Sequence, residues 1–267
     1  MADGLHVVVC LKQVPDPEAP VSGYQIDADA KRVKPVGIPP VISPFDENAL
    51  ELALRLRETR SGKVTAISVG HKLSKAVLRK ALSVGADELF MIDDQAFAGD
   101  RLDGYGTALV LCEAIKKIGA FDLILTGRQA SDTNAGVVGL YLAEMLEVPS
   151  ITLAQKTSIH DGRLLVERVL PDGHEVVEAE MPALVTVSSE AGELRPLRMK
   201  DMREAKSKPM HIWTEADLEL TRPLEMKIVL EALSKPERRR ECRFIEGQTP
   251  RKAGEELALR LRDDGII

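Results

Sequence analysis

Short apolar segments alternate with longer helix-like segments through the first half of the chain, and this alternation constrains the fold more than any other feature. Apolar runs occupy residues 64–70, 88–93 and 121–126, and the segments between them, 75–86 and 106–119, have helical length and spacing. Buried strands that each lead into a helix are typical of a parallel sheet covered on both faces. The sequence therefore predicts an α/β fold with a doubly wound, mostly parallel sheet and right-handed crossovers.

The flanking segments extend this sheet. HVVVCLKQV at 6–14 is predicted to be a buried strand, residues 24–36 a solvent-facing hairpin, and SPFDENALELALRLRE a helix with Ser43 or Asp46 as its N-cap. Beyond residue 150 the apolar runs lie close together and include a DG turn, which favours mixed or antiparallel pairing. We expect the α/β domain to span residues 1–190.

The character of the sequence changes after Glu190. Arg, Lys, Met and Pro follow one another with little periodicity, and EELALRLRDDGII then closes the chain as a helix. A region so poor in core of its own is either a flexible tail or an arm that lies on another chain. Apolar anchors favour an arm over residues 191–267. These anchors are Leu197, Met199, Met202, Met210, Ile212 and Trp213.

Composition and scattered polar residues exclude several classes of function. The formal net charge of -6 argues against binding to a nucleic-acid backbone. The three cysteines lack the spacing of a disulfide framework or a metal site, which favours a reducing cytoplasm. No apolar run approaches the ~20 residues of a membrane-spanning helix. The five histidines are scattered and no serine lies in a GxSxG motif, so no catalytic set emerges.

The stretch GRQASDTNAGVVG, from Gly127 to Gly139, is the strongest candidate for a ligand site. It connects the apolar run FDLILT to the helix-like LYLAEML, and open α/β sheets bind ligands at such junctions. Thr133 or Asn134 is predicted to cap the helix, while Gly136 and Gly139 would let a phosphate or ribose approach the backbone.

Three further side chains suit a nucleotide at this junction. Asp132 can accept a ribose hydroxyl, Arg128 can neutralise a phosphate or pair with a carboxylate, and Phe45 can pack on a planar ligand or serve as a core anchor. A strand-to-helix turn needs small polar residues in any case, and the GxGxxG and P-loop patterns are absent. From these residues alone, a nucleotide site and an ordinary turn both stay open.

Several segments together resemble the β subunit of electron transfer flavoproteins. They are VVCLKQVPD, SPFDENALELALRL, ALSVGADELFMID, LILTGRQASDTNAGVVG and MPALVTVSS, in this order and spacing. The resemblance implies a Rossmann-like, adenine-nucleotide-binding domain in a heterodimer with a homologous α subunit. It also implies one FAD held mainly by the α subunit against this chain, and an arm, residues 191–267, that embraces that partner.

The resemblance also implies which residues bind the nucleotide and the redox partner. The cofactor-binding residues would be Cys10, Ser43, Pro44, Phe45, Asp46, Val69, Gly127, Arg128, Gln129, Ala130, Ser131, Asp132, Thr133, Asn134, Ala135, Gly136, Val137 and Val138. Phe45 would lie near the flavin of the α subunit. A loop that recognises an acyl-CoA dehydrogenase or similar flavoenzyme would fall within Glu193 to Met202, with Leu197 and Met199 as its apolar contacts.

The second nucleotide is either AMP or a second FAD. Members with AMP tend to carry a run of aspartates after GxQAxD, whereas bifurcating members, which oxidise NADH, tend to read GRQAxDGDTAQVG. This chain keeps the ends of the second pattern and differs over residues 133–137, while Arg128 and Val138 favour FAD. An electron carrier is the favoured function. The alternatives are a nucleotide-sensing module of the stress-protein kind and an ATP-dependent ligase or pyrophosphatase of a related fold.

Overall fold

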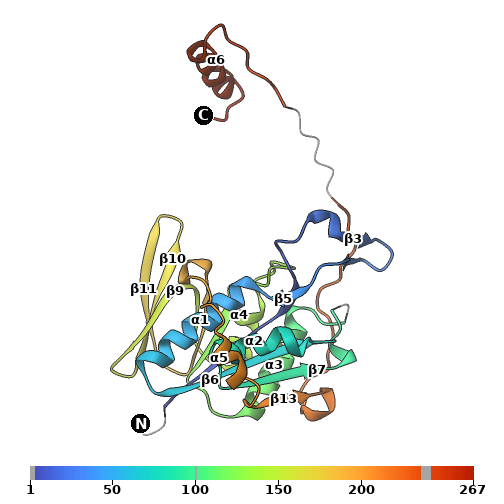
Figure 1. Cartoon of the computed structure of the whole chain (residues 1–267), viewed down its shortest axis with the longest axis vertical. Coiled ribbons are helices and arrows are strands. Elements are labelled where there is room, and N and C mark those ends of the chain that lie inside the picture. The colour runs from blue at the N-terminus through green and yellow to red at the C-terminus, as the bar shows by residue number, and fades with distance from the viewer. Residues whose placement is uncertain (1–3, 100, 236–241) are drawn as a thin grey trace. The chain divides into compact units, whose positions relative to one another are not determined.

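The computed structural model describes residues 4–99, 101–235 and 242–267 (Figure 1). These residues form two compact units, which divide between Ala232 and Leu233. The predicted arm therefore contributes its first part, residues 191–232, to the first unit. Residues 236–241 of the predicted arm lie outside the described residues.

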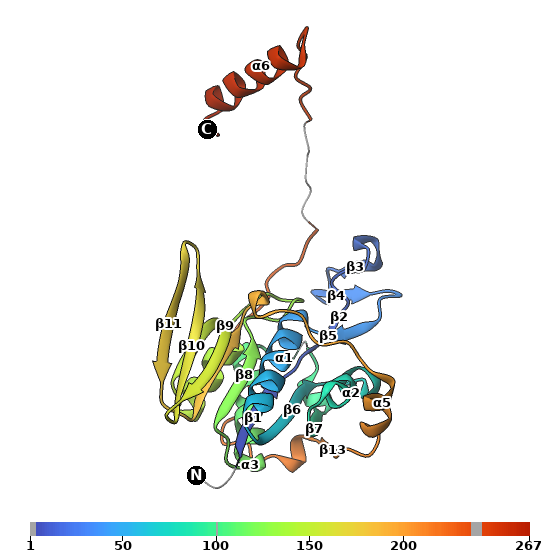
Figure 2. The same ribbon diagram turned by 60° about the vertical axis from the view of Figure 1, so that its left-hand side comes forward.

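The first unit is built on one large mixed sheet (Figures 1 and 2). In spatial order its described strands are β11 Gly173–Ala179, β10 Arg163–Leu170, β9 Ser150–His160, β12 Ala183–Val187, β8 Leu123–Gly127, β1 Leu5–Cys10, β6 Gly62–Gly70, β7 Glu88–Asp93 and β13 Met210–Trp213. All neighbours from β9 to β13 are parallel, and β10 pairs antiparallel with both β9 and β11. The predicted doubly wound α/β fold and the mixed pairing beyond residue 150 are confirmed.

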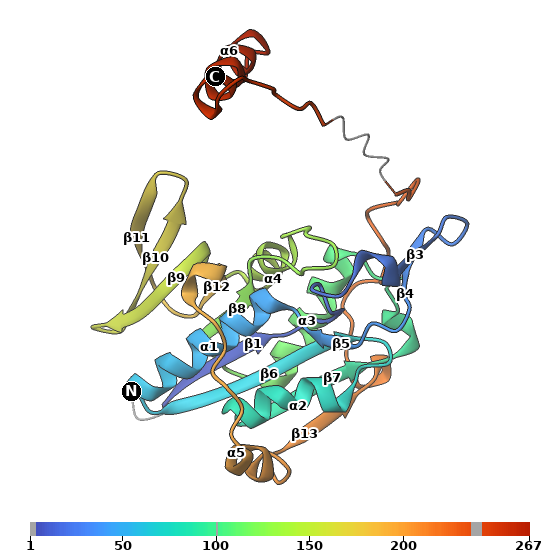
Figure 3. The same ribbon diagram turned by 45° about the horizontal axis from the view of Figure 1, so that its top comes forward.

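Helices cover both faces of the parallel part of the sheet (Figure 3). The described helices of this unit are α1 Pro44–Thr59, α2 Lys75–Val84, α3 Gly104–Ile118, α4 Val138–Leu146 and α5 Met199–Glu204. Because side chains alternate along a strand, Val7 and Val9 of β1 pack with α1 and α2, whereas Val8 packs with α3 and α4. The apolar runs of the sequence are buried on both faces for this reason.

The apolar run at 6–14 is two strands, which corrects the prediction of one. β1 ends at Cys10, and β2 (Gln13–Pro15) pairs with β5 (Pro40–Ile42) in a separate two-stranded sheet. The chain leaves the main sheet at Lys12, because its backbone N–H donates to the carboxylate of Asp46 at 2.7 Å. The predicted hairpin at 24–36 is confirmed as β3 (Tyr24–Asp27) and β4 (Arg32–Pro35).

Segment 191–198 is clamped to α1 by hydrogen bonds and ion pairs. Asn48 donates to the carbonyl of Gly192 at 2.6 Å, and the Arg195 guanidinium contacts both oxygens of Glu51. Burial alone would raise the pKa of Glu51, but the hydrogen bonds from Arg195 hold it below its usual value. This segment is therefore part of the first unit.

Strand β13 extends the main sheet beyond β7. Lys208, just before it, donates to two carbonyls at the end of α2, those of Leu82 at 2.9 Å and Ala86 at 2.7 Å. Trp213 packs against Phe90 of β7 with ring centroids 4.8 Å apart. Met210 and Trp213, expected to contact another chain, are thus half-buried on this chain's own sheet.

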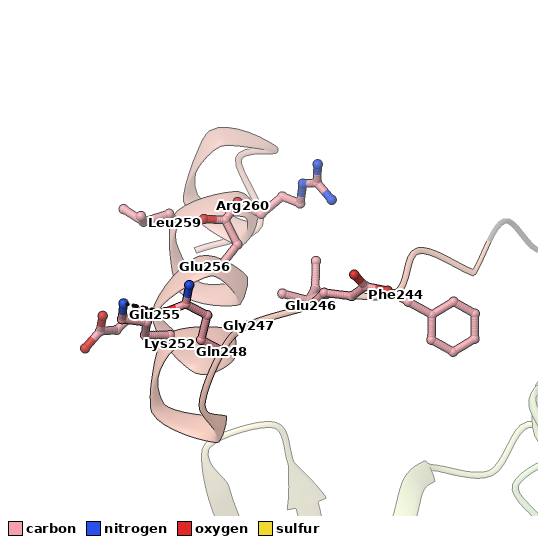
Figure 4. Close-up of a pocket in the computed structure, with 10 residues that line it drawn as sticks. Phe244, Glu246, Gly247, Gln248, Lys252, Glu255, Glu256, Leu259 and Arg260 are labelled. Carbon is pink, nitrogen blue, oxygen red and sulfur yellow. Dashed lines mark hydrogen bonds between the residues drawn. The ribbon is translucent and has the colours of Figure 1, made fainter.

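The second unit contains helix α6 (Pro250–Asp263), which has no buried residue. Thr249 caps it by accepting the N–H of Lys252, and the preceding segment runs close to its first turn, with Gly247 against Ala253. Figure 4 shows the shallow hollow between them, lined largely by charged side chains such as Glu255, Glu256 and Arg260. Among the described residues of the whole chain, no helix has both the length and the apolar character needed to span a membrane.

Candidate functional site

A cavity of ≈ 700 Å³ opens beyond the carboxyl ends of β1, β6 and β8. The strand order places β6 and β7 on one side of β1, and β8 and β12 on the other. The chain therefore changes direction between β1 and β8, which is the topological switch point where open α/β sheets bind ligands. The volume suits a ligand of nucleotide size.

The structure brings most of the predicted site residues together. Those that line the cavity are Cys10, Asp46, Val69, Gly127, Arg128, Gln129, Ala130, Asp132, Thr133, Ala135, Gly136, Val137 and Val138. Ser43, Pro44, Phe45, Ser131 and Asn134 adjoin them in sequence but do not line it. Cys10 is buried at the end of β1, and burial raises the pKa of its thiol, so it serves as an apolar wall rather than a nucleophile.

The loop between β8 and α4 has a turn of its own, which corrects the predicted helix cap. The N–H of Asn134 donates to the carbonyl of Ala130 at 2.9 Å, and its side-chain oxygen accepts from Gln129 at 2.9 Å. Helix α4 begins four residues later at Val138, and its N-cap residue Val137 makes no side-chain cap. Neither Thr133 nor Asn134 therefore caps α4.

Two glycines of this loop have different roles. Gly136 has a φ of 66°, a conformation that favours glycine, and it lines the cavity as expected. Gly139 instead faces the sheet, because a Cβ there would lie 2.8 Å from Thr126 Oγ1 and 3.0 Å from Thr186 Cγ2. Close packing of α4 on β8 and β12 thus requires glycine at 139.

The variant Gly139→Ala is expected to lower the free energy of unfolding by about 1–3 kcal/mol, because the added methyl group overpacks the contact between α4 and the sheet. Denaturant unfolding of the purified chain measures this change. Gly99→Ala is the control, since a Cβ at that position meets no atom within 4 Å. Equal stability of the two variants would contradict this packing role.

Asp46 connects the ends of the two strands that flank the switch point. It lies in the first turn of α1, and its two oxygens accept the N–H groups of Lys12 at 2.7 Å and Gly127 at 3.0 Å. Burial raises the pKa of Asp46 to about 7, although both N–H groups favour the charged form. Asp46 is thus not the N-cap of α1. Ser43 occupies that position, and its side chain makes no cap bond.

The charged side chains of the loop are held in defined positions. Asp132 forms an ion pair with Lys12 at 2.7 Å, and the Arg128 guanidinium lies 4.6 Å from the centre of the Phe45 ring. Phe45 thus packs against Arg128 within this chain. Three buried polar atoms of predicted site residues have no hydrogen-bond partner among the described residues: Ser43 Oγ, Arg128 Nε and Ser131 Oγ.

These features fit an adenine nucleotide. The cavity is walled largely by apolar side chains, Gly136 brings backbone to its lining, and Arg128 supplies positive charge, while Lys12 there is paired with Asp132. Of the three orphaned atoms only Arg128 Nε belongs to a residue that lines the cavity, and such atoms are rare in folded proteins unless a ligand or water satisfies them.

Other lining residues were not predicted. Lys12 and Gln13 come two and three residues after the end of β1, inside the run 6–14 that was predicted as one strand, and their polar side chains within that apolar run were a usable signal. Asp103 caps α3 three residues before the predicted start of that helix. Met226, Ile228, Val229 and Leu230 also line the cavity, and nothing in their sequence indicates it.

The doubly wound sheet and the cavity at its switch point define the class of this chain as a Rossmann-like α/β protein. A family model described as "Electron transfer flavoprotein domain" matches residues 33–218. The chain belongs to the electron transfer flavoprotein family.

Curated relatives agree with this membership. "Electron transfer flavoprotein subunit beta" from Thermoanaerobacterium thermosaccharolyticum is 40% identical over 217 residues, covering 81% of each chain. "Caffeyl-CoA reductase-Etf complex subunit CarD" from Acetobacterium woodii is 34% identical, again over 81% of each chain. "Protein FixA" from Azorhizobium caulinodans is 35% identical over 80% of this chain and 76% of its own.

Proposed function

We propose that this chain is the β subunit of a heterodimeric electron transfer flavoprotein and binds an adenine nucleotide in the switch-point cavity. The observation that carries this proposal is the convergence of the predicted residues around one cavity, where parallel strands β1, β6 and β8 end. Such a subunit accepts electrons from an acyl-CoA dehydrogenase-type flavoenzyme and passes them to another acceptor. The names of the β-subunit relatives support it.

The proposed roles of the chain's residues are binding and orientation. Lys12 and Arg128 would neutralise phosphate, the backbone around Gly136 would approach it, and Cys10 and Val69 would contact the apolar part of the nucleotide. A flavin, when bound, supplies the electron transfer itself. This division of labour is consistent with a cavity that holds no recognisable nucleophile and base pair among its described residues.

The cofactors proposed are one FAD shared with the α subunit and a second nucleotide, AMP or FAD, in this chain. Arg128 and Val138 favour FAD, and both line the cavity. With a second FAD the complex would bifurcate electrons and oxidise NADH, whereas with AMP it would be a simple carrier. A relative named as part of a caffeyl-CoA reductase complex supports an acyl-CoA-type redox partner.

The proposed contact with the redox partner is the segment from Glu193 to Met202. Leu197 and Met199 are 43% and 69% exposed there, although the adjoining residues are clamped to α1. An apolar contact on a firmly held segment suits repeated docking. The second unit, with α6, is proposed to bind the α subunit.

Counting nucleotides in the heterodimer tests this function. We expect the chain, co-expressed with an α subunit, to form a heterodimer that releases one FAD plus one AMP, or two FAD, after acid treatment. NADH oxidation is expected only in the second case. A stable monomer that binds ATP and never co-purifies flavin with a partner would contradict the proposal and favour a nucleotide-sensing module.

A further inference from the structure

A short segment far along the chain returns to the mouth of the cavity. We call residues Met226–Leu230 the strap. Four of its five residues line the cavity, together with Ala30 and Lys31 from the turn between β3 and β4. The strap belongs to the first compact unit, which ends at Ala232.

One carboxylate fixes both the strap and the start of α3. Asp103 Oδ1 accepts the N–H of Gly106 at 2.8 Å and so caps α3. Its other oxygen accepts the N–H groups of Lys227 at 2.6 Å and Ile228 at 3.1 Å. Burial tends to raise the pKa of Asp103, but these N–H groups hold it below its usual value, as expected for a carboxylate that stays ionised.

The chain leading to the strap is also anchored along α3. Thr221 donates to Glu113 at 3.0 Å, Leu224 packs against the core on this face, and the Lys227 ammonium lies 5.7 Å from the centre of the Tyr105 ring. These contacts place the strap at a defined position beside the cavity.

The strap nevertheless leaves apolar surface uncovered. Ile228 is 60% exposed and Val229 is 75% exposed, at the edge of a cavity whose other walls include buried Leu111 and Phe97. Covering such side chains removes apolar surface from water, which is favourable. A flat aromatic ring in the cavity would cover them.

We propose that the strap is a ligand-binding segment whose apolar side chains pack on the aromatic ring of the bound nucleotide, with Asp103 as the positioning residue that holds it there. This inference rests on the proposed nucleotide site. It adds the strap, which precedes the second unit in sequence, to the residues that contact the nucleotide. It also assigns Asp103 a role separate from capping α3.

The variant Asp103→Ser separates these two roles. Serine still caps α3, because its hydroxyl accepts the N–H of Gly106, but it offers no second oxygen for Lys227 and Ile228. In the purified heterodimer, the second nucleotide, bound in addition to the shared FAD, is expected to dissociate about tenfold faster. The reason is that the strap loses its two hydrogen bonds to a charged carboxylate. Nucleotide retained by filtration after dilution measures this rate for AMP or FAD, whichever co-purifies.

Asp94→Ser is a matched control. Asp94 likewise caps a helical turn with one oxygen, through the N–H of Ala96, and accepts the N–H of Glu215 with the other, but it does not line the cavity. Its substitution is expected to leave nucleotide dissociation unchanged. Hydrogen exchange gives a second readout: amide exchange in the strap should slow when nucleotide is bound, and this protection should be lost in Asp103→Ser.

A second pair of variants tests the apolar contact. Ile228→Ser combined with Val229→Ser is expected to speed nucleotide dissociation, whereas Val176→Ser, at a 63% exposed position on β11, is not. Wild-type dissociation in both Asp103→Ser and the strap double variant would overturn the inference alone. A wild-type heterodimer with no nucleotide beyond one FAD would overturn the proposed cavity function, and the inference with it.

Discussion

Asp46→Asn is expected to destabilise the chain by about 2 kcal/mol at pH 5.5. At this pH Asp46 is protonated, and its hydroxyl oxygen can still accept an N–H through a lone pair. The asparagine oxygen can accept one of the two N–H groups, but its amide nitrogen is a donor only and cannot accept the other. Lys12, just after β1, and Gly127, at the end of β8, both donate to this carboxyl group in wild type. The variant would therefore no longer join the two strand ends through one side chain. Denaturant unfolding at fixed ionic strength measures the difference from wild type.

The pH dependence of this difference has a definite sign. Burial raises the pKa of Asp46 in the folded chain from 3.8 to about 7. The folded state therefore binds the proton more tightly than the unfolded state does. The stabilisation that this proton gives the folded state is complete below about pH 4 and is lost as the pH rises through about 7. Between pH 5.5 and pH 8, wild type should lose about 2 kcal/mol relative to Asp46→Asn.

Glu47→Gln controls for loss of a carboxylate from the same turn of α1, where Glu47 forms an ion pair with Lys80 at 2.6 Å. A partly exposed pair of this kind contributes at most about 1 kcal/mol. If the stability difference between wild type and Asp46→Asn grew as the pH rose, Asp46 would be a carboxylate stabilised by its N–H bonds more than it is destabilised by burial. The role assigned to its protonation would then be wrong.

The fold could be predicted from the sequence wherever local pattern and tertiary packing agree. Helix α1 follows from the spacing of Leu50, Ala53 and Leu54, which are all fully buried. Strand β13 could not be predicted, because four residues among many prolines and charges carry no periodicity. Its place in the sheet depends on distant contacts, such as that of Lys208 with the end of α2.

The residues of the candidate site likewise fall into those that local sequence could predict and those that it could not. Residues 127–138 follow a strand and precede a helix, so chain order alone places them at the cavity. The strap reaches the cavity through bonds to Asp103, a residue 124 positions away from Lys227, and no local signal marks such a contact. The predicted caps Thr133 and Asn134 were wrong because the loop closes a turn of its own, through Asn134 and Ala130, before α4 begins.

Removal of residues 233–267 is expected to abolish heterodimer formation while leaving the first unit folded. Helix α6 is 14 residues long and buries none of them within this chain, and Leu257 and Leu259 are 45% and 47% exposed. An isolated helix of this length is marginal in water, so a second surface is needed to stabilise it. The affinity for a tagged α subunit, measured by co-purification, should fall by at least about 100-fold.

The position of the cut decides what this experiment tests. Truncation after Ala232 keeps β13, the strap and the Arg195 clamp, and a cooperative thermal transition should therefore persist. Truncation after Glu190 would remove all three and is expected to destabilise the first unit as well, so loss of the heterodimer there would not identify the binding segment. Only the cut at 232 separates assembly from folding.

Point variants in α6 make the same test without deleting chain. Leu257→Ser combined with Leu261→Ser removes two apolar side chains one turn apart and is expected to weaken the heterodimer strongly. Glu256→Ser combined with Arg260→Ser is the control, because it changes the adjacent pair on the helix and leaves the net charge unaltered. A heterodimer that survives both the truncation and the leucine variant would show that the first unit alone binds the α subunit. Leu257 and Leu261 of α6 would then need another partner.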